Sequence, residues 1–331
     1  MSIARALLAG PAARRALVDG RVGAVEIALS QGAYVRLEHD WVMLAEPVAP
    51  FGPLSLAVHG LERLDLPPGL PVHVTGSRMV LGGHAILLER MRERRMAPLT
   101  SVPAAGRYAI VTAAAAALAA LPPPPSFLGR GIAALAASRL RDAVHALAGL
   151  GEGLTPAGDD VLAGYAAARV ALGAPEGVAL NGSVPLSTLA AERSSALGLA
   201  YLRSAERGEL PDAGAQLLVA LRRGSVGAAQ AAVPGLRAWG ASSGIALAWG
   251  MAAAVRCSVP LDRERLAAQT NGVVLTGRAP AEDTSALNPP ARDRRETDAA
   301  SRIQAWDLRL QGRGDRGFCR AAWGLLGCTP I

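Results

Sequence analysis

The hydrophobic pattern of the chain changes near residue 98, and this change constrains the fold more than any other feature. Before it, short β-prone runs alternate with glycine and proline turn signals, which predicts strands at 22–29, 33–37, 41–44, 54–58, 72–75, 79–81 and 84–88. The first twenty residues predict a short helix. After it, an alanine-rich helical period predicts helices at 131–148, 156–172, 186–207, 211–222, 228–239 and 243–256.

The predicted fold class is therefore α+β. We expect a small antiparallel β domain, barrel-like or sandwich-like, followed by an alanine-rich helical domain with glycine-rich loops at helix starts. The predicted boundaries are 1–97 for the β-rich domain and 98–256 for the helical, ligand-binding domain. Residues 257–331 are rich in charged residues, proline and glycine without a sustained period, so we expect an irregular, partly disordered tail.

Composition excludes several classes of protein. All 34 basic residues are arginine, so a Schiff-base lysine, a Walker A lysine and the kinase ion-pair lysine are ruled out. The net charge of +7 raises nucleic acid as a partner, but the arginines are scattered and no aromatic residues interleave with them. No apolar run reaches the ~18 residues of a membrane span. We expect a cytoplasmic protein that binds neither nucleic acid nor membrane.

The segment 149–164, GLGEGLTPAGDDVLAG, carries the strongest functional signal. Glycines are used where the backbone needs positive φ or a very close approach. Four of them precede the aspartate pair, and the first three lead into a predicted N-cap, Thr155, and a proline at the first helical position. The loop thus presents backbone N–H groups at the positive end of a helix, followed by Asp159 and Asp160. This pattern indicates a site for a small polar ligand.

The two carboxylates allow two interpretations. They could hold a Mg²⁺ ion that bridges to a phosphate, or they could accept hydrogen bonds from the N–H groups of an amide or urea. Adjacent aspartates on a helix point about 100° apart, so we expect one to face the ligand, with Asp159 preferred, and the other to orient the loop or an arginine. The alternative is a glycine-rich turn whose aspartates only complement the helix dipole.

Further candidates follow the first loop along the chain. The segment 240–244, GASSG, also precedes an apolar helix, and Ser242 or Ser243 could cap that helix. Arg193 could supply a cation to the ligand or form a surface ion pair. No nucleophile–base pair emerges, so any chemistry would rest on positioning and electrostatics. Asp159 and Asp160 are the candidate catalytic residues and Mg²⁺ ligands, and the candidate substrate-binding residues are Gly151, Gly153, Leu154, Thr155, Gly158, Arg193, Ser194, Ser195, Ser242, Ser243 and Gly244.

The loop resembles the signature of the AllH family, a subunit associated with oxamate carbamoyltransferase, whose usual form is close to GLGPGLTPSGDD. Here Glu152 replaces the proline and Ala157 the serine, while the glycines, Thr155-Pro156 and the aspartate pair are retained. The resemblance extends more weakly over 22–255. Family members often carry a His and an Asp around the second loop, where this chain has Ala241 and Ala246.

The resemblance implies an enzyme subunit that acts with other protein subunits in allantoin and purine catabolism. Its ligand would be a ureide or oxamate-like compound, with carbamoyl phosphate as co-substrate. Two alternatives stay open: a non-catalytic binding or scaffold subunit of such a complex, and a Mg²⁺-dependent protein that binds a phosphate ligand.

Overall fold

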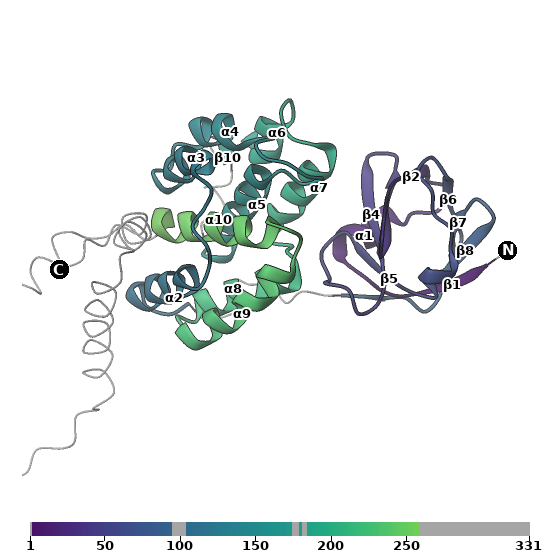
Figure 1. The fold of residues 1–331 in the computed structure, drawn as a ribbon, viewed down its shortest axis with the longest axis horizontal. Helices are drawn as coiled ribbons and strands as arrows, with labels where there is room; N and C mark the ends of the chain where they lie inside the picture. The colour runs from purple at the N-terminus through teal and green to yellow at the C-terminus, as the bar shows by residue number, and fades with distance from the viewer. Residues whose placement is uncertain (1, 95–103, 174–178, 181–183, 259–331) are drawn as a thin grey trace, which may run out of the picture. The chain divides into compact units, whose positions relative to one another are not determined.

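The computed structural model describes residues 2–94, 104–173, 179–180 and 184–258, and the described part of the chain belongs to one compact unit. A β-barrel with a mixed sheet is followed by a helical region, which confirms the predicted α+β class (Figure 1). The domain boundaries at 97 and 256 stay predictions. Beyond Ser258, the predicted tail lies outside the described residues.

The barrel is formed by a sheet in the order β5-β4-β3-β2-β6-β7-β8-β1, and β1 pairs back onto β5 to close it. The sheet is mixed, and not wholly antiparallel as predicted, because β4–β5, β1–β8 and the short edge pair β1–β9 are parallel. The strands are β1 (Ile3–Ala9), β2 (Val22–Leu29), β3 (Gly32–Leu37), β4 (Asp40–Ala45), β5 (Ser55–His59), β6 (Pro71–Thr75), β7 (Arg78–Leu81), β8 (His84–Leu87) and β9 (Arg92–Glu93).

Alternation of side chains fills the barrel. In β3, Ala33, Val35 and Leu37 are fully buried and point into the barrel core, whereas Tyr34 and Arg36 point to the outer face. On that outer face Tyr34 pairs with Ile27 of β2 and Met43 of β4. The resulting apolar row belongs to a second buried cluster, which the barrel shares with the helical region.

The helix predicted for the first twenty residues is wrong in its first half. Residues 3–9 form β1, and only α1 (Pro11–Ala16) is helical. The segment IARALLA has the alanine and leucine content of a helix, but its buried residues Ala4, Ala6 and Ala9 fill the gap between β8 and β5. Tertiary pairing therefore overrides helix propensity here.

The helical region is arranged around α10 (Ser243–Ser258), which contacts α5, α3, α2, α9 and α8 (Figure 1). Close packing of α10 on α5 depends on glycine: a Cβ atom at Gly164 would overlap the Leu247 carbonyl, and one at Gly250 would overlap the Val161 carbonyl. The other helices are α2 (Arg107–Ala119), α3 (Ser126–Ala136), α4 (Leu140–Leu147), α5 (Ala157–Ala171), α6 (Leu186–Ala190), α7 (Ala196–Ala205), α8 (Asp212–Arg222) and α9 (Val226–Ala238). The pair β10 (Ala179–Leu180) and β11 (Val184–Pro185) forms a small hairpin before α6.

Two predicted helices are each divided in two. The helix predicted at 131–148 breaks between α3 and α4 at Ser138, which has a φ of 59°. The helix predicted at 186–207 breaks between α6 and α7, where the Ser195 hydroxyl accepts a hydrogen bond from the Gly198 amide at 2.9 Å and caps α7. A serine that bonds to the backbone in this way starts a new helix instead of continuing the old one.

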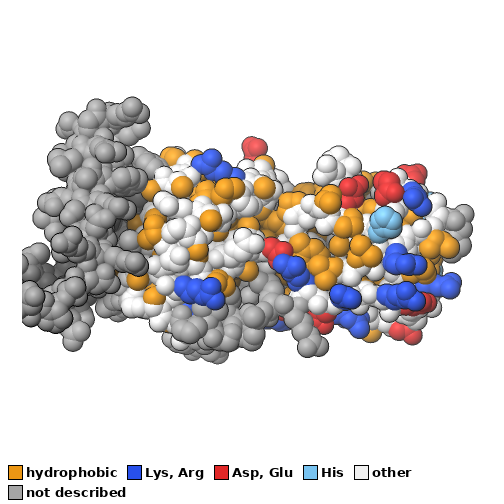
Figure 2. All heavy atoms as spheres, turned by 90° about the horizontal axis from the view of Figure 1, so that it is seen from below, with side chains coloured by type: hydrophobic (Ala, Val, Ile, Leu, Met, Phe, Trp, Pro, Cys, Tyr) orange, Lys and Arg blue, Asp and Glu red, His pale blue; other side chains and the backbone are white. Residues whose placement is uncertain are grey.

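Charged side chains on the barrel are mixed in sign. Figure 2 shows arginine and acidic side chains interspersed on the face in view. Several of them form ion pairs, including Arg36 with Glu26 at 2.8 Å and Arg21 with Asp40. Among the helices that the structure describes, none combines the length and the apolar character needed to cross a bilayer.

Candidate functional site

The glycine-rich loop 149–156 folds through left-handed backbone conformations. Gly149, Gly151 and Gly153 have φ values of 71°, 116° and 97°, which residues with a Cβ atom rarely adopt. A Cβ atom at Gly149 would also overlap the carbonyl of Arg193. The loop is therefore held directly against the turn that separates α6 from α7.

Gly158 provides a second close approach, at the start of α5. Its amide donates to the Leu150 carbonyl at 2.8 Å, and a Cβ atom would overlap the carbonyl of Leu147. The helix begins at Ala157, with Pro156 in the cap position and no side-chain cap. The prediction that Thr155 caps the helix is therefore wrong, because its hydroxyl lies 3.1 Å from the hydroxyl of Ser243 instead.

Asp159 joins the loop to the α6–α7 turn. Its Oδ1 accepts hydrogen bonds from the Gly149 amide at 2.8 Å and from the Ser194 hydroxyl at 2.7 Å. Its Oδ2 is buried with no hydrogen-bond partner among the described residues. Gly198 of α7 lies against this oxygen, and a Cβ atom there would overlap it. Oδ1 of the carboxylate thus holds the loop to the α6–α7 turn, and Oδ2 lies against Gly198.

Asp160 is also buried with an unpartnered Oδ2 atom, as judged over the part of the chain that is described. Burial raises the pKa of Asp160 to about 8; the hydroxyls of Ser243 and Thr155 oppose this rise, whereas the charge of Asp159 adds to it. Burial also raises the pKa of Asp159, and hydrogen bonds from Gly149, Ser194 and the Ser195 backbone oppose that shift. At neutral pH Asp160 is therefore protonated, and it lies beside Asp159, which is held by the hydrogen bonds named above.

Three predicted segments therefore meet in space. The Thr155–Ser243 contact joins the first loop to the second, and Asp159 joins the first loop to Ser194. The Ser195 hydroxyl donates to the Leu154 carbonyl at 2.9 Å. These contacts bring together the candidates from 149–160, 193–195 and 242–244 in one cluster. Their positions in the sequence do not by themselves predict this.

Some predicted residues point elsewhere. The Arg193 side chain donates to the carbonyl of His145 in α4 at 3.0 Å, so its observed partner is a backbone oxygen and not an aspartate. Gly244 is needed for packing, since a Cβ atom would overlap the Leu236 carbonyl. Ser242 is exposed, and the Leu154 side chain is exposed at the rim of the loop.

The donor set suits hydrogen bonding better than a divalent cation. Mg²⁺ takes six oxygen ligands in octahedral geometry, and in proteins one or two of them are usually carboxylates. Here burial raises the pKa of Asp160 to about 8, which opposes its ionised form, and one oxygen of Asp159 is committed to the loop. No third His, Cys, Asp or Glu joins the pair to form a metal-binding group within the described residues.

Sequence reasoning missed a buried pair of tyrosines near this cluster. Tyr34 of β3 and Tyr201 of α7 are buried, and their hydroxyl oxygens are 3.2 Å apart. Each ring has an edge-on aromatic neighbour: Trp41 for Tyr34 and Trp239 for Tyr201. The available signal was β4, DWVMLA, whose Trp41 and Met43 would face solvent if the barrel stood alone.

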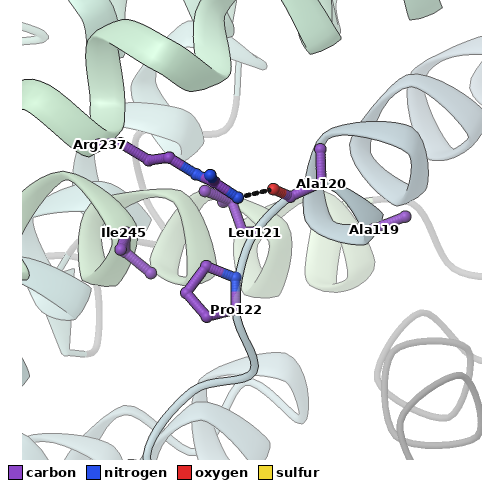
Figure 3. A pocket seen from close by; sticks show the side chains of 6 residues that line it. All are labelled: Ala119, Ala120, Leu121, Pro122, Arg237 and Ile245. Atoms are coloured by element: carbon purple, nitrogen blue, oxygen red, sulfur yellow. Dashed lines mark hydrogen bonds between the residues drawn. The ribbon is translucent and has the colours of Figure 1, made fainter. Parts of the chain in front are cut away.

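A pocket of about 590 Å³ lies between the end of α2, α9 and α10. Figure 3 shows Arg237 reaching across it to donate to the Ala120 carbonyl, at 2.5 Å. Its other lining residues are Ala119, Leu121, Pro122 and Ile245. None of the predicted site residues lines this pocket, so it is separate from the aspartate cluster.

Comparison with curated proteins and with solved structures returned no match. A family model does match, and it covers the loop, the α6–α7 turn and the second loop but not the barrel. Its description indicates a subunit associated with oxamate carbamoyltransferase. Residues 147–255 match the family described as oxamate carbamoyltransferase subunit AllH, which confirms the resemblance carried by the glycine-rich loop.

Proposed function

We propose that this protein is a subunit of a carbamoyltransferase-type enzyme and that it holds a ureide or oxamate-like ligand at the loop Gly149 to Asp160, with carbamoyl phosphate as co-substrate. The match to the oxamate carbamoyltransferase subunit family supports the reaction class. The observation that carries the proposal is the pair of buried, unpartnered oxygens, Asp159 Oδ2 and Asp160 Oδ2.

Those two oxygens favour a ligand that both donates and accepts hydrogen bonds, because Asp159 Oδ2 can only accept whereas Asp160 carries a proton at neutral pH. A buried polar atom without a partner is costly, and native structures contain few of them. A carbamoyl or amide group offers an N–H donor for Asp159 Oδ2 and a carbonyl oxygen that can accept from the protonated carboxyl of Asp160. Acceptor atoms of the same ligand could bind the hydroxyls of Thr155, Ser194, Ser195 and Ser243 or the backbone N–H groups of the loop.

The role proposed for the site is to orient the ligand and stabilise charge. Carbamoyl transfer requires that the carbamoyl carbon and the attacking nitrogen be held in line, and positioning of this kind can supply much of the rate acceleration. Because the chain has no lysine, an anionic co-substrate would be bound by arginine, backbone N–H groups or a partner subunit. We place this chemistry in the cytoplasm, with other subunits completing the enzyme.

Thermal denaturation of the full chain tests the proposal. We expect oxalurate or carbamoyl phosphate to raise the melting temperature, and Asp159→Asn to abolish the shift. This variant is well suited to the test because an asparagine Oδ1 can still accept from Gly149 and Ser194, whereas its NH₂ group would oppose the donors of the ligand. Absence of any shift with a ureide, phosphate or Mg²⁺ would contradict the proposal.

A non-catalytic binding or scaffold subunit is the second candidate. The alanines at 241 and 246, where the family often carries His and Asp, favour it. It predicts that the chain co-purifies with a partner and binds ligand without turnover. A third candidate, a Mg²⁺-dependent phosphate-binding protein, predicts that Mg²⁺ alone raises the melting temperature.

A further inference from the structure

The Tyr34–Tyr201 pair has an unused hydrogen-bonding capacity. Each phenol carries one O–H hydrogen, but the contact between the two hydroxyls uses only one of them. Neither hydroxyl has another hydrogen bond within the described residues. Both side chains are less than one tenth exposed, at 8% and 9%, so bulk water does not readily satisfy the remaining hydrogen.

The pair lies beside the aspartate cluster. Tyr201 is three residues after Gly198 in α7, so the two lie on the same helix face, and Gly198 abuts Asp159 Oδ2. The charge of Asp160 also raises the pKa of both tyrosines, after the larger effect of burial in each case. The tyrosine pair, which has a hydrogen to donate, is thus near a buried acceptor, Asp159 Oδ2.

Several contacts fix the tyrosines in place. The Tyr34 and Trp41 rings meet edge to face with centroids 6.4 Å apart, as do the Tyr201 and Trp239 rings at 6.3 Å. Trp239 also packs over Gly52 of the barrel, where a Cβ atom would strike the indole ring. The hydroxyl pair is therefore preorganised, which lowers the entropic cost of binding a ligand.

We propose that the carbamoyl group of the ligand binds between the aspartates and the tyrosine pair, its NH₂ group donating to Asp159 and its carbonyl oxygen accepting from a tyrosine hydroxyl. Tyr34 is then a specificity-determining residue that the barrel contributes to the site. This inference rests on the proposed function, since it requires that the loop holds a carbamoyl ligand. It adds a residue outside the matched segment 147–255.

Titration calorimetry with oxalurate on the full chain tests this inference, with oxalate as a ligand that lacks the carbamoyl group. We expect Tyr34→Phe to weaken oxalurate binding about tenfold, the typical effect of one lost hydrogen bond, and to leave oxalate binding unchanged. Tyr108→Phe is the matched control because Tyr108 is 71% exposed on α2. Tyr201→Phe gives an independent measurement should Tyr34→Phe fail to fold.

The outcomes separate this inference from the proposed function. Oxalurate binding by the wild type that survives in both tyrosine variants would overturn the role of the tyrosines and leave the loop site standing. An equal loss for oxalurate and oxalate would also overturn it, because that result indicates a structural role. No oxalurate binding by the wild type would overturn both.

Discussion

The hydroxyl of Thr155 lies 3.1 Å from the hydroxyl of Ser243, 88 positions further along the chain. This contact joins the two loops that precede the long central helices α5 and α10. Asp160, in the first turn of α5, is buried next to it, and this burial raises its pKa although both hydroxyls oppose the rise. The two helix starts therefore form one polar cluster inside an otherwise apolar helical region.

The protonated state of Asp160 predicts a specific pH dependence of stability. The folded protein retains the Asp160 proton up to about pH 8, whereas an ordinary aspartate releases it near pH 3.8. The folded state thus binds more protons between these values, so the free energy of unfolding falls as the pH rises through this window. Asp160→Asn removes the ionisation, and its melting temperature should exceed that of the wild type by a margin that widens from pH 5 to pH 8.

Asp142→Asn is the control for that experiment. Asp142 is exposed at the start of α4 beside Arg139. Its substitution should change the melting temperature only slightly, and by the same amount at pH 5 and at pH 8. A difference between Asp160→Asn and the wild type that stays constant over this range would contradict the assignment.

Ser194→Ala should lower the free energy of unfolding by weakening the attachment of the loop to the α6–α7 turn. The substitution removes one of the two donors to Asp159 Oδ1, and leaving a buried carboxylate under-satisfied costs about 1–2 kcal/mol. Urea denaturation measures this loss. Ser77→Ala is the matched control: it removes an exposed hydrogen bond to Glu89 and should change stability by less than about 0.5 kcal/mol. Equal effects of the two variants would show that the Asp159 link contributes nothing.

Gly158→Ala should destabilise the protein because its Cβ atom would overlap a backbone carbonyl, that of Leu147. Overpacking of this kind costs about 1–3 kcal/mol. Gly129→Ala in α3 is the control, since nothing lies within 4 Å of a Cβ atom there. Its helix propensity should increase the free energy of unfolding by at most about 1 kcal/mol. We expect Gly158→Ala to lower the melting temperature and Gly129→Ala to raise it; an unchanged melting temperature for Gly158→Ala would show that α4 and α5 can separate freely.

Much of the architecture follows from local sequence. Strand β2 was predicted at its observed bounds, because alternation between two turn signals is a local property. Strand β1 could not be predicted in this way, since residues 3–9 become a strand only by pairing with β8 and β5, far along the chain. The cap at Ser195 was likewise hidden inside a continuous helical pattern.

The cluster could be predicted only in part. The loop 149–160 was evident because its glycines and aspartates are contiguous. The same sequence does not show which oxygen of Asp159 is committed to Gly149, nor that Tyr34 meets Tyr201 across 167 positions. The first relationship depends on how the loop meets the α6–α7 turn and the second on how the outer face of β3 packs against α7, and only the folded chain defines them.

A crystal structure of the full chain grown with oxalurate tests the proposed ligand site. We expect the NH₂ nitrogen of the ligand to lie within hydrogen-bonding distance of Asp159 Oδ2, inside the loop Gly149 to Asp160. Oxalurate bound at another position, with Asp159 Oδ2 still unpartnered, would contradict the proposal.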